Sequence, residues 1–288
     1  MTASNEDHAA LRAAAEAGAG PSAGLCTAGL CTIVGIEGSF SRRLGAQLAV
    51  HPDGSVTGSL ADGCLERELA LEVAAGGAPR VIRYGAGSQR IDFRLPCGGG
   101  LDILIDPSPD RAACTAALER LARREEAALP LPAPSPLAAR RYVPALRLLL
   151  LGEGPELAAM AQIAAAAGIE AECHGREGGS LALGQRPDHL AADRWTAIVL
   201  LFHDHEWEEA LLDWALRTPA FFIGAQGGAP ARAARSARLA ALGYDLAQIA
   251  RIASPIGTVG HSREPLALAL SVLAGISGAY ELRHPHHG

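Results

Sequence analysis

A run of apolar residues that ends in a glycine-rich turn constrains the fold of this chain more than any other feature. The run spans Leu146–Leu151 and is followed by Gly152-Glu153-Gly154-Pro155 and a helix-like stretch from Glu156 to Ala167. A strand that is apolar at nearly every position is buried on both faces, as in a parallel sheet covered by helices. Glycines at such a turn let the backbone approach a small group, usually a phosphate. The second half is therefore predicted to open with a βαβ unit of the dinucleotide-binding type.

Strands and helices continue to alternate after this unit, which favours an open parallel sheet with helices on both faces. We expect residues 145–288 to form a Rossmann-type domain. Its further strands are predicted at Glu170–His174, Thr196–Phe202 and Ala220–Ile223, and its helices at Pro155–Ala167, Glu206–Arg217, Ala229–Leu242 and Glu264–Ser277.

The first half follows a different pattern, with more strands than helices. Residues 1–129 are predicted to form an α+β domain with a mixed sheet, and the proline-dense residues 130–144 (PLPAPSP at their start) are interpreted as a semi-rigid linker. The expected strands are Leu30–Glu37, Gln47–His51, Ser55–Ser59, Arg80–Tyr84, Ile91–Leu95 and Leu101–Ile105, and the expected helices are Asp7–Ala17, Cys64–Ala75 and Asp110–Ala128.

Composition excludes several kinds of chemistry. The 288 residues include no lysine, so all 25 basic residues are arginine, which excludes a Walker-type phosphate loop, a Schiff base and a lysine general base. A net charge of -6 does not favour nucleic acid as a partner. We find no signal peptide and no apolar stretch long enough to span a membrane, and therefore expect a cytoplasmic protein with free thiols.

The loop after the first expected strand and the helix that begins near Cys64 carry suitable groups for an anion. Ser39, Arg42 and Arg43 place hydroxyl and guanidinium groups in one loop, a combination that suits a phosphate monoester. Arginines in loops are also often simply solvated. Gly63-Cys64 places a thiol at the start of a helix, where the positive end of the helix dipole favours the thiolate.

A second thiol, Cys97, precedes three glycines, Gly98, Gly99 and Gly100, and then a strand. A cysteine in a glycine run has little apolar packing available, so burial explains it less well than it explains Cys114 or Cys173, which fall on apolar faces. Cys64 and Cys97, together with the arginine loop, form the strongest functional candidate in the first half.

The second half offers two candidate groups at the expected carboxyl edge of its sheet. Gly152 and Gly154 supply two of the three glycines of a dinucleotide fingerprint, and they can equally be explained as a tight turn. His203, Asp204 and His205 follow the third strand of this domain, where ligands approach open α/β sheets. Asp204 can instead cap the following helix, and the histidines can be solvated.

Taken in order, several segments resemble the XdhC/CoxI family of xanthine dehydrogenase accessory proteins. The similarity runs from about Thr32 to Gly275, and the whole series in this order is more specific than any one segment. The segments are EGSFSRRLGAQLAV (37–50), GSLADGCLERE (58–68), RYG (83–85), LPCGGGLDILIDP (95–107), LLLLGEGPEL (148–157), FHDHEWEEALL (202–212), FFIGAQG (221–227) and RIASPIG (251–257).

The resemblance implies a protein that binds molybdenum cofactor (molybdopterin), supports its terminal sulfuration and inserts it into a molybdenum hydroxylase. It implies a chaperone and not a turnover enzyme, with an apo-hydroxylase and a cysteine desulfurase as partners and a homodimeric state. Cys64 and Cys97 would contact the metal or relay sulfur, and Arg42 and Arg43 would hold the phosphate. Glu66 belongs to the family's GCxE element and Gly98–Gly100 to its CGGG element.

Two alternatives remain open at the level of sequence. One is an NAD(P)-dependent oxidoreductase that uses the Rossmann-type half, with His203 or His205 as acid or base and a nucleotide at Gly152 and Gly154. The absence of an acidic residue after the second strand, which ends in Cys173-His174, argues against it. The other is an adaptor that has lost ligand binding.

Overall fold

The computed structural model describes residues 3–16, 28–61, 63–88, 98–176, 179–260, 262 and 264–283. It divides the chain into two compact units, with Pro144 in the first and Ala145 in the second. No helix within these ranges is long and apolar enough to cross a bilayer.

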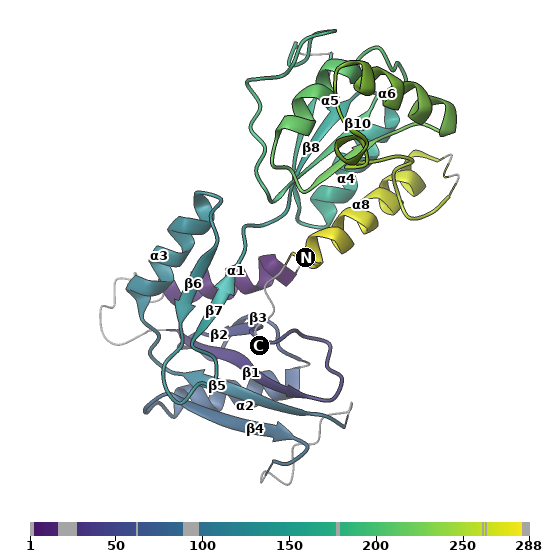
Figure 1. The fold of residues 1–288 in the computed structure, drawn as a ribbon. Coiled ribbons are helices and arrows are strands. Elements are labelled where there is room, and N and C mark those ends of the chain that lie inside the picture. Colours follow the sequence, from purple (N-terminus) through teal and green to yellow (C-terminus); the bar gives the residue numbers. More distant parts are fainter. Residues whose placement is uncertain are drawn as a thin grey trace. The chain divides into compact units, whose positions relative to one another are not determined.

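The N-terminal unit is built on a five-stranded sheet in the order β3-β2-β1-β5-β4 (Figure 1). Its elements are α1 (Ala3–Glu16), β1 (Gly29–Glu37), β2 (Gln47–Val50), β3 (Val56–Gly58), α2 (Gly63–Ala74), β4 (Arg80–Gly85), β5 (Gly100–Asp106), α3 (Arg111–Ala122), β6 (Ala127–Pro130) and β7 (Ala139–Tyr142).

Both faces of this sheet are covered, because successive side chains of its strands point to opposite sides. Cys31 and Ile33 of β1 pack with Leu65 and Leu69 of α2 in one buried cluster. The neighbouring β1 residue, Leu30, belongs to a second cluster with residues of α1, α3, β6 and β7. The alternation along β1 therefore places α2 on one face and the other helices on the opposite face.

The sheet is antiparallel at every described pairing, whereas a mixed sheet was predicted. Helix α2 carries the chain from β3 at one edge of the sheet to β4 at the other edge, so the strands that it connects are not neighbours. The predicted strand Ile91–Leu95 lies outside the described residues.

The end of this unit also differs from the prediction. The predicted helix at Asp110 is confirmed: Asp110 is the N-cap of α3 and accepts from the backbone N–H groups of Ala112 and Ala113 at 2.9 and 3.1 Å. The helix stops at Ala122 and does not continue to Ala128, because the chain turns at residues 123–124 and residues 127–130 alternate between buried and exposed positions as β6. The residues interpreted as a linker, 130–144, contain β7, which pairs with β6 and buries Tyr142 in the second cluster.

The C-terminal unit contains the predicted Rossmann-type parallel sheet, in the order β12-β11-β10-β8-β9. The α/β fold class is thus confirmed. Its elements are β8 (Arg147–Gly152), α4 (Pro155–Ala166), β9 (Glu170–His174), β10 (Thr196–Leu201), α5 (Glu208–Arg217), β11 (Phe222–Ala225), α6 (Ala229–Ala241), α7 (Leu246–Ile249), β12 (Ile252–Ala253) and α8 (Pro265–Glu281).

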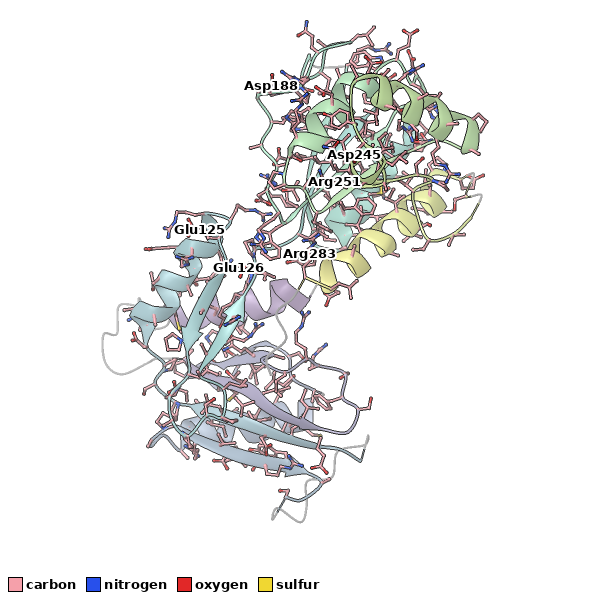
Figure 2. The ribbon with its side chains drawn as sticks, viewed as in Figure 1. Glu125, Glu126, Asp188, Asp245, Arg251 and Arg283 are labelled. Carbon is pink, nitrogen blue, oxygen red and sulfur yellow. The ribbon has the colours of Figure 1, made fainter. Side chains whose placement is uncertain are left out.

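Helices cover this parallel sheet in pairs: α4 packs against α8, and α5 packs against α6 (Figure 1). The central strands β8 and β10 are buried along almost their whole length, which accounts for their nearly continuous apolar sequence. The loop before β11 is held by Arg251, labelled in Figure 2, which donates to the carbonyl groups of Leu216 and Thr218 at 2.7 and 3.2 Å.

Candidate functional site

One end of the N-terminal sheet gathers the loops that the sequence singled out. In the strand register, Gly100 at the start of β5 lies opposite both Glu37 at the end of β1 and Gly85 at the end of β4. The loops that follow β1 and β4 and the turn that precedes β5 therefore leave the sheet at the same end. We call this end, formed by residues 38–45, 59–64, 86–88 and 98–99, the N-terminal rim; position 62 within it lies outside the described residues.

The arginine loop and the glycine turn touch at the rim. A Cβ atom on Gly38 would lie 3.5 Å from the Cα atom of Gly99. The Ala86 N–H donates to the Gly99 carbonyl at 2.8 Å, which ties the loop after β4 to the same turn. Two of the predicted cofactor-binding glycines, Gly98 and Gly99, thus belong to one cluster with the loop that carries Ser39. Cys97 lies outside the described residues.

The arginine loop is anchored by its own apolar residues. Phe40 and Leu44 are partly buried against the cluster that α2 covers, while Ser39 remains exposed. The Nε atom of Arg42 donates to the Ser59 carbonyl at 3.1 Å. This hydrogen bond places the predicted phosphate-binding arginine beside the segment that leads to Cys64, and Arg43 is its neighbour in the same loop.

Cys64 is exposed in the first turn of α2. The Arg67 guanidinium, one helical turn later, lies 3.7 Å from the Cys64 sulfur through its Nη2 atom. The exposed sulfur of Cys64 therefore lies beside a positive charge at the N-terminal end of a helix. Arg67 was not among the predicted site residues. Its (i, i+3) spacing from Cys64 in the predicted helix could have indicated that the two side chains are neighbours.

Glu66 was predicted to bind cofactor, and the structure places its carboxylate on the loop that precedes α2. Its Oε1 atom accepts from the Ser59 hydroxyl at 2.9 Å and from the Leu60 N–H at 3.2 Å. These bonds hold the segment between β3 and α2, so the role of Glu66 seen in the structure is to position the backbone near Cys64.

Gly100 has a structural reason to be glycine. A Cβ atom there would overlap the Arg83 guanidinium and lie 2.7 Å from the Ala86 carbonyl oxygen. Arg83 itself pairs with Asp102, at 3.0 Å, and with Glu37. Sequence reasoning missed Arg83, because only the strand register brings it to the glycine turn.

The four cysteines that the structure describes differ in chemistry. Burial raises the pKa of Cys31 to about 12 and that of Cys114 to about 11, so both stay protonated near neutral pH. Cys173 was expected to be buried but is exposed on the edge strand β9, with its pKa raised by partial burial. Among these four, Cys64 combines exposure with an adjacent guanidinium.

We expect Cys64 to be alkylated at least about tenfold faster than Cys31 and Cys114 when the native protein is treated with iodoacetamide at pH 8. Only the thiolate reacts, and Cys31 and Cys114 are buried and have raised pKa values, whereas Cys64 is exposed. Peptide mass spectrometry at successive times would measure the order of labelling. Alkylation in denaturant supplies the control in which these sites should react similarly. Labelling of Cys31 ahead of Cys64 in the native protein would contradict this description of the rim.

The carboxyl edge of the C-terminal sheet brings the other predicted groups together. The order of strands reverses between β8 and β10, and ligands of open α/β sheets enter at such a point. Gly152 ends β8 there, Gly154 follows it, and His203 follows β10. The His203 Nε2 atom lies 3.2 Å from Glu156 Oε2, so His203 contacts the first turn of the helix that follows the glycine turn.

However, backbone packing and backbone conformation explain why these two positions of the turn are glycine. A Cβ atom on Gly152 would lie 2.5 Å from the Leu201 carbonyl oxygen of β10, and Gly154 has a φ of 87°. The Glu156 carboxylate, whose side chain is 12% exposed, lies in the first turn of α4, the place that a pyrophosphate would take. The turn is shaped by strand packing and already carries negative charge.

Asp204 and His205 take part in local structure. Asp204 Oδ1 accepts from the Glu206 N–H at 3.0 Å and so forms a turn; it does not cap the following helix, as the alternative for this residue had it, because the N-cap of α5 is Trp207. The His205 Nδ1 atom lies 2.9 Å from Glu208 Oε1, and Glu208 forms a buried ion pair with Arg235 at 2.8 Å. Within the described ranges, no group of three His, Cys, Asp or Glu side chains is arranged to hold a metal ion.

Comparisons with known proteins agree with this architecture. The XdhC and CoxI family matches residues 26–85, which include the arginine loop and Cys64, and the XdhC Rossmann domain matches residues 148–276. The molybdenum cofactor insertion chaperone PaoD of Escherichia coli (strain K12) is 32% identical over 267 residues, which cover 86% of this chain and 82% of PaoD. The chain belongs to the XdhC and CoxI family.

The fold of this XdhC and CoxI family member is also found in a crystal structure of a xanthine dehydrogenase from Bacillus halodurans. The two superpose with a TM-score of 0.69 at 17% sequence identity, over 93% of this chain and 95% of the other. At this identity the likeness concerns the fold. The family resemblance drawn from the sequence motifs is confirmed.

Proposed function

We propose that this protein is a molybdenum cofactor chaperone that receives the cofactor at the N-terminal rim and inserts it into a molybdenum hydroxylase. The observation that carries the proposal is the clustering of the arginine loop, the Cys64 segment and the glycine turn at one end of one sheet. The similarity to a chaperone named for molybdenum cofactor insertion supports it.

The chemistry of the rim fits such a cargo. Molybdopterin carries a phosphate, for which guanidinium groups are good partners because they form charge-assisted hydrogen bonds. The loop of Arg42 and Arg43 would hold this phosphate, and the exposed backbone of Gly98 would approach the pterin. The exposed Cys64 sulfur, 3.7 Å from the Arg67 guanidinium, would face the metal or carry sulfur. Cys97 is proposed as the second thiol.

Finer parts of the function rest on the family resemblance. We propose a xanthine dehydrogenase-type hydroxylase as the recipient, support of cofactor sulfuration with a cysteine desulfurase as partner, a homodimeric state and a cytoplasmic location. The protein would act by binding and release and not as a turnover enzyme. The Glu156 carboxylate in the first turn of α4 makes the oxidoreductase alternative less favourable, because a pyrophosphate would bind at this helix N-terminus.

The thiol's role can be tested by cofactor retention. Protein co-expressed with an active cofactor pathway would be purified, and its bound molybdenum and pterin measured per chain. We expect Cys64→Ser to lower retention of the cofactor about tenfold, because the loss of one strong contact weakens binding by about that factor. The double variant Cys64→Ser/Cys97→Ser should abolish retention. Cys173→Ser removes an exposed thiol of the other unit and should retain the cofactor fully. Unchanged retention in the double variant would remove the thiols from the mechanism.

A further inference from the structure

The Arg83 guanidinium, near the end of β4, contacts three segments that meet beside the N-terminal rim. Its Nε atom donates to the Ala86 carbonyl at 2.9 Å, in the loop after β4, and its Nη1 atom donates to Asp102 Oδ2 of β5 at 3.0 Å. Its Nη2 atom donates to the carboxylate of Glu37, the last residue of β1. Neither Arg83 nor Glu37 has a part in the function proposed above.

The guanidinium lies directly against the backbone of the glycine turn. A Cβ atom on Gly100 would overlap Arg83 at Nη2 and Cζ, and a Cβ atom on Gly35 would overlap the Asp102 carboxylate. Neither glycine has a positive φ, so backbone conformation does not account for them, whereas the space that the ion pair needs does. The Nη2 atom of Arg83 therefore lies at the turn where the cofactor is proposed to bind.

The partners of Arg83 are exposed to different degrees. The Ala86 carbonyl belongs to the backbone, and the Asp102 side chain is 34% exposed, but the Glu37 side chain is 68% exposed. An exposed ion pair contributes little, because water competes for both charges and holding the side chain costs entropy. Glu37 is thus the partner that another anion can displace most easily, while Asp102 and Ala86 keep the guanidinium in place.

An anion that displaces Glu37 must suit a guanidinium. Guanidinium groups bind carboxylates and phosphates with the same N–H groups and similar geometry. We propose that Arg83 Nη2 binds a phosphate at the rim, and that the Glu37 carboxylate occupies this position until the phosphate displaces it. The inference rests on the proposed function for the source of the phosphate, which is the phosphate of the molybdenum cofactor.

The binding of phosphate can be followed at Arg83 itself, without cofactor. The Nε–Hε signals of arginine are recorded by ¹H–¹⁵N NMR, and the signal missing from Arg83→Lys belongs to Arg83. Inorganic phosphate should shift this signal in the cofactor-free protein. Glu37→Gln should lower the half-saturating phosphate concentration about two- to fivefold, as expected when an exposed competing carboxylate loses its charge.

A matched control separates this effect from net charge. Asp53 lies in the turn after β2, and the register of β1 and β2 places this turn at the end of the sheet opposite Glu37. Asp53→Asn removes the same charge and keeps the oxygen that accepts from the Ser55 N–H at 2.9 Å. It should leave the half-saturating phosphate concentration unchanged.

Cofactor retention tests whether Glu37 and Arg83 act on each other. After co-expression with an active cofactor pathway and dialysis, Glu37→Gln should retain about two- to fivefold more cofactor, and Arg83→Met less by a similar factor. Glu37→Gln/Arg83→Met should retain no more than Arg83→Met alone, because a carboxylate that competes for Arg83 has no effect once Arg83 is removed. A purely structural ion pair predicts the opposite sign for Glu37→Gln, since its loss would loosen the rim.

Three results would overturn the proposal: an Arg83 signal that does not respond to millimolar phosphate, weaker phosphate binding in Glu37→Gln, or a gain from Glu37→Gln that persists without Arg83. A shift of the Arg83 signal with unchanged cofactor retention would keep the phosphate site and identify free phosphate as its ligand. Unchanged retention in Cys64→Ser/Cys97→Ser would remove the thiols alone. A failure of this site and a failure of the proposed function would therefore be seen separately.

Discussion

Replacing Arg235 by methionine is expected to lower the free energy of unfolding of the C-terminal unit by about 3–5 kcal/mol. The Arg235 and Glu208 side chains are 4% and 3% exposed. Arg235 donates to both carboxylate oxygens, from Nε at 2.9 Å and from Nη2 at 2.8 Å. Removing the guanidinium would leave a buried carboxylate without its main partner, and this uncompensated charge accounts for most of the expected loss.

Urea denaturation followed by tryptophan fluorescence would measure the effect, because all three tryptophans of the chain lie between residues 195 and 214 and so report on this unit. Arg238→Met, on the exposed side of the same helix, is the matched control and should change stability by less than about 0.5 kcal/mol.

The double variant Glu208→Leu/Arg235→Met should recover much of the lost stability, since replacing both members of a buried pair is often nearly neutral. A loss below about 1 kcal/mol for Arg235→Met, against the 3–5 kcal/mol usual for a broken buried pair, would show that the pair is solvated in solution.

Replacing Gly152 by alanine is expected to cost about 3 kcal/mol, the upper part of the usual range for overpacking. The new methyl group would lie 2.5 Å from the Leu201 carbonyl oxygen, and Leu201 is the register partner of Gly152 in the parallel pair of β8 and β10. Backbone of a central strand cannot move aside as a flexible side chain can. The same fluorescence-monitored denaturation would measure the loss.

Gly278→Ala provides the control for this substitution. Gly278 lies within α8, and a Cβ atom there would meet nothing within 4 Å, so we expect a gain of about 0.5–1 kcal/mol from better helix propensity. If Gly152→Ala proved as stable as the unmodified protein, strand packing would no longer explain this glycine, and a ligand at the turn would become the better explanation.

The second half could be predicted well because its signals are local. The apolar strands β8 and β10 and the turn Gly152–Pro155 define βαβ units without long-range information. Element boundaries moved by a few residues, as for β11, predicted at Ala220–Ile223 and found at Phe222–Ala225. The short elements α7 and β12 were missed, since four and two residues carry too little periodicity to detect.

The first half was predicted less completely. The residues after Ala122 continue a helix-like composition, yet the chain turns there and residues 127–130 form β6, because pairing with β7 buries Leu129 and Tyr142. Helix propensity is a weak preference that such tertiary burial overrides. The antiparallel sheet likewise follows from which strands become neighbours, and this depends on packing across the whole unit.

The sequence by itself determined the α/β fold class, the family, and the residues that carry chemistry at the rim: an arginine loop, a helix-start thiol and a glycine turn. Tertiary structure decided which of them meet. The strand register places Gly99 against Gly38 and brings Arg83 to Gly100, and it assigns Gly152 to strand packing. The rim as a whole depends on tertiary structure, because the residues that form it come from four separate segments, and only folding brings segments distant in sequence into contact.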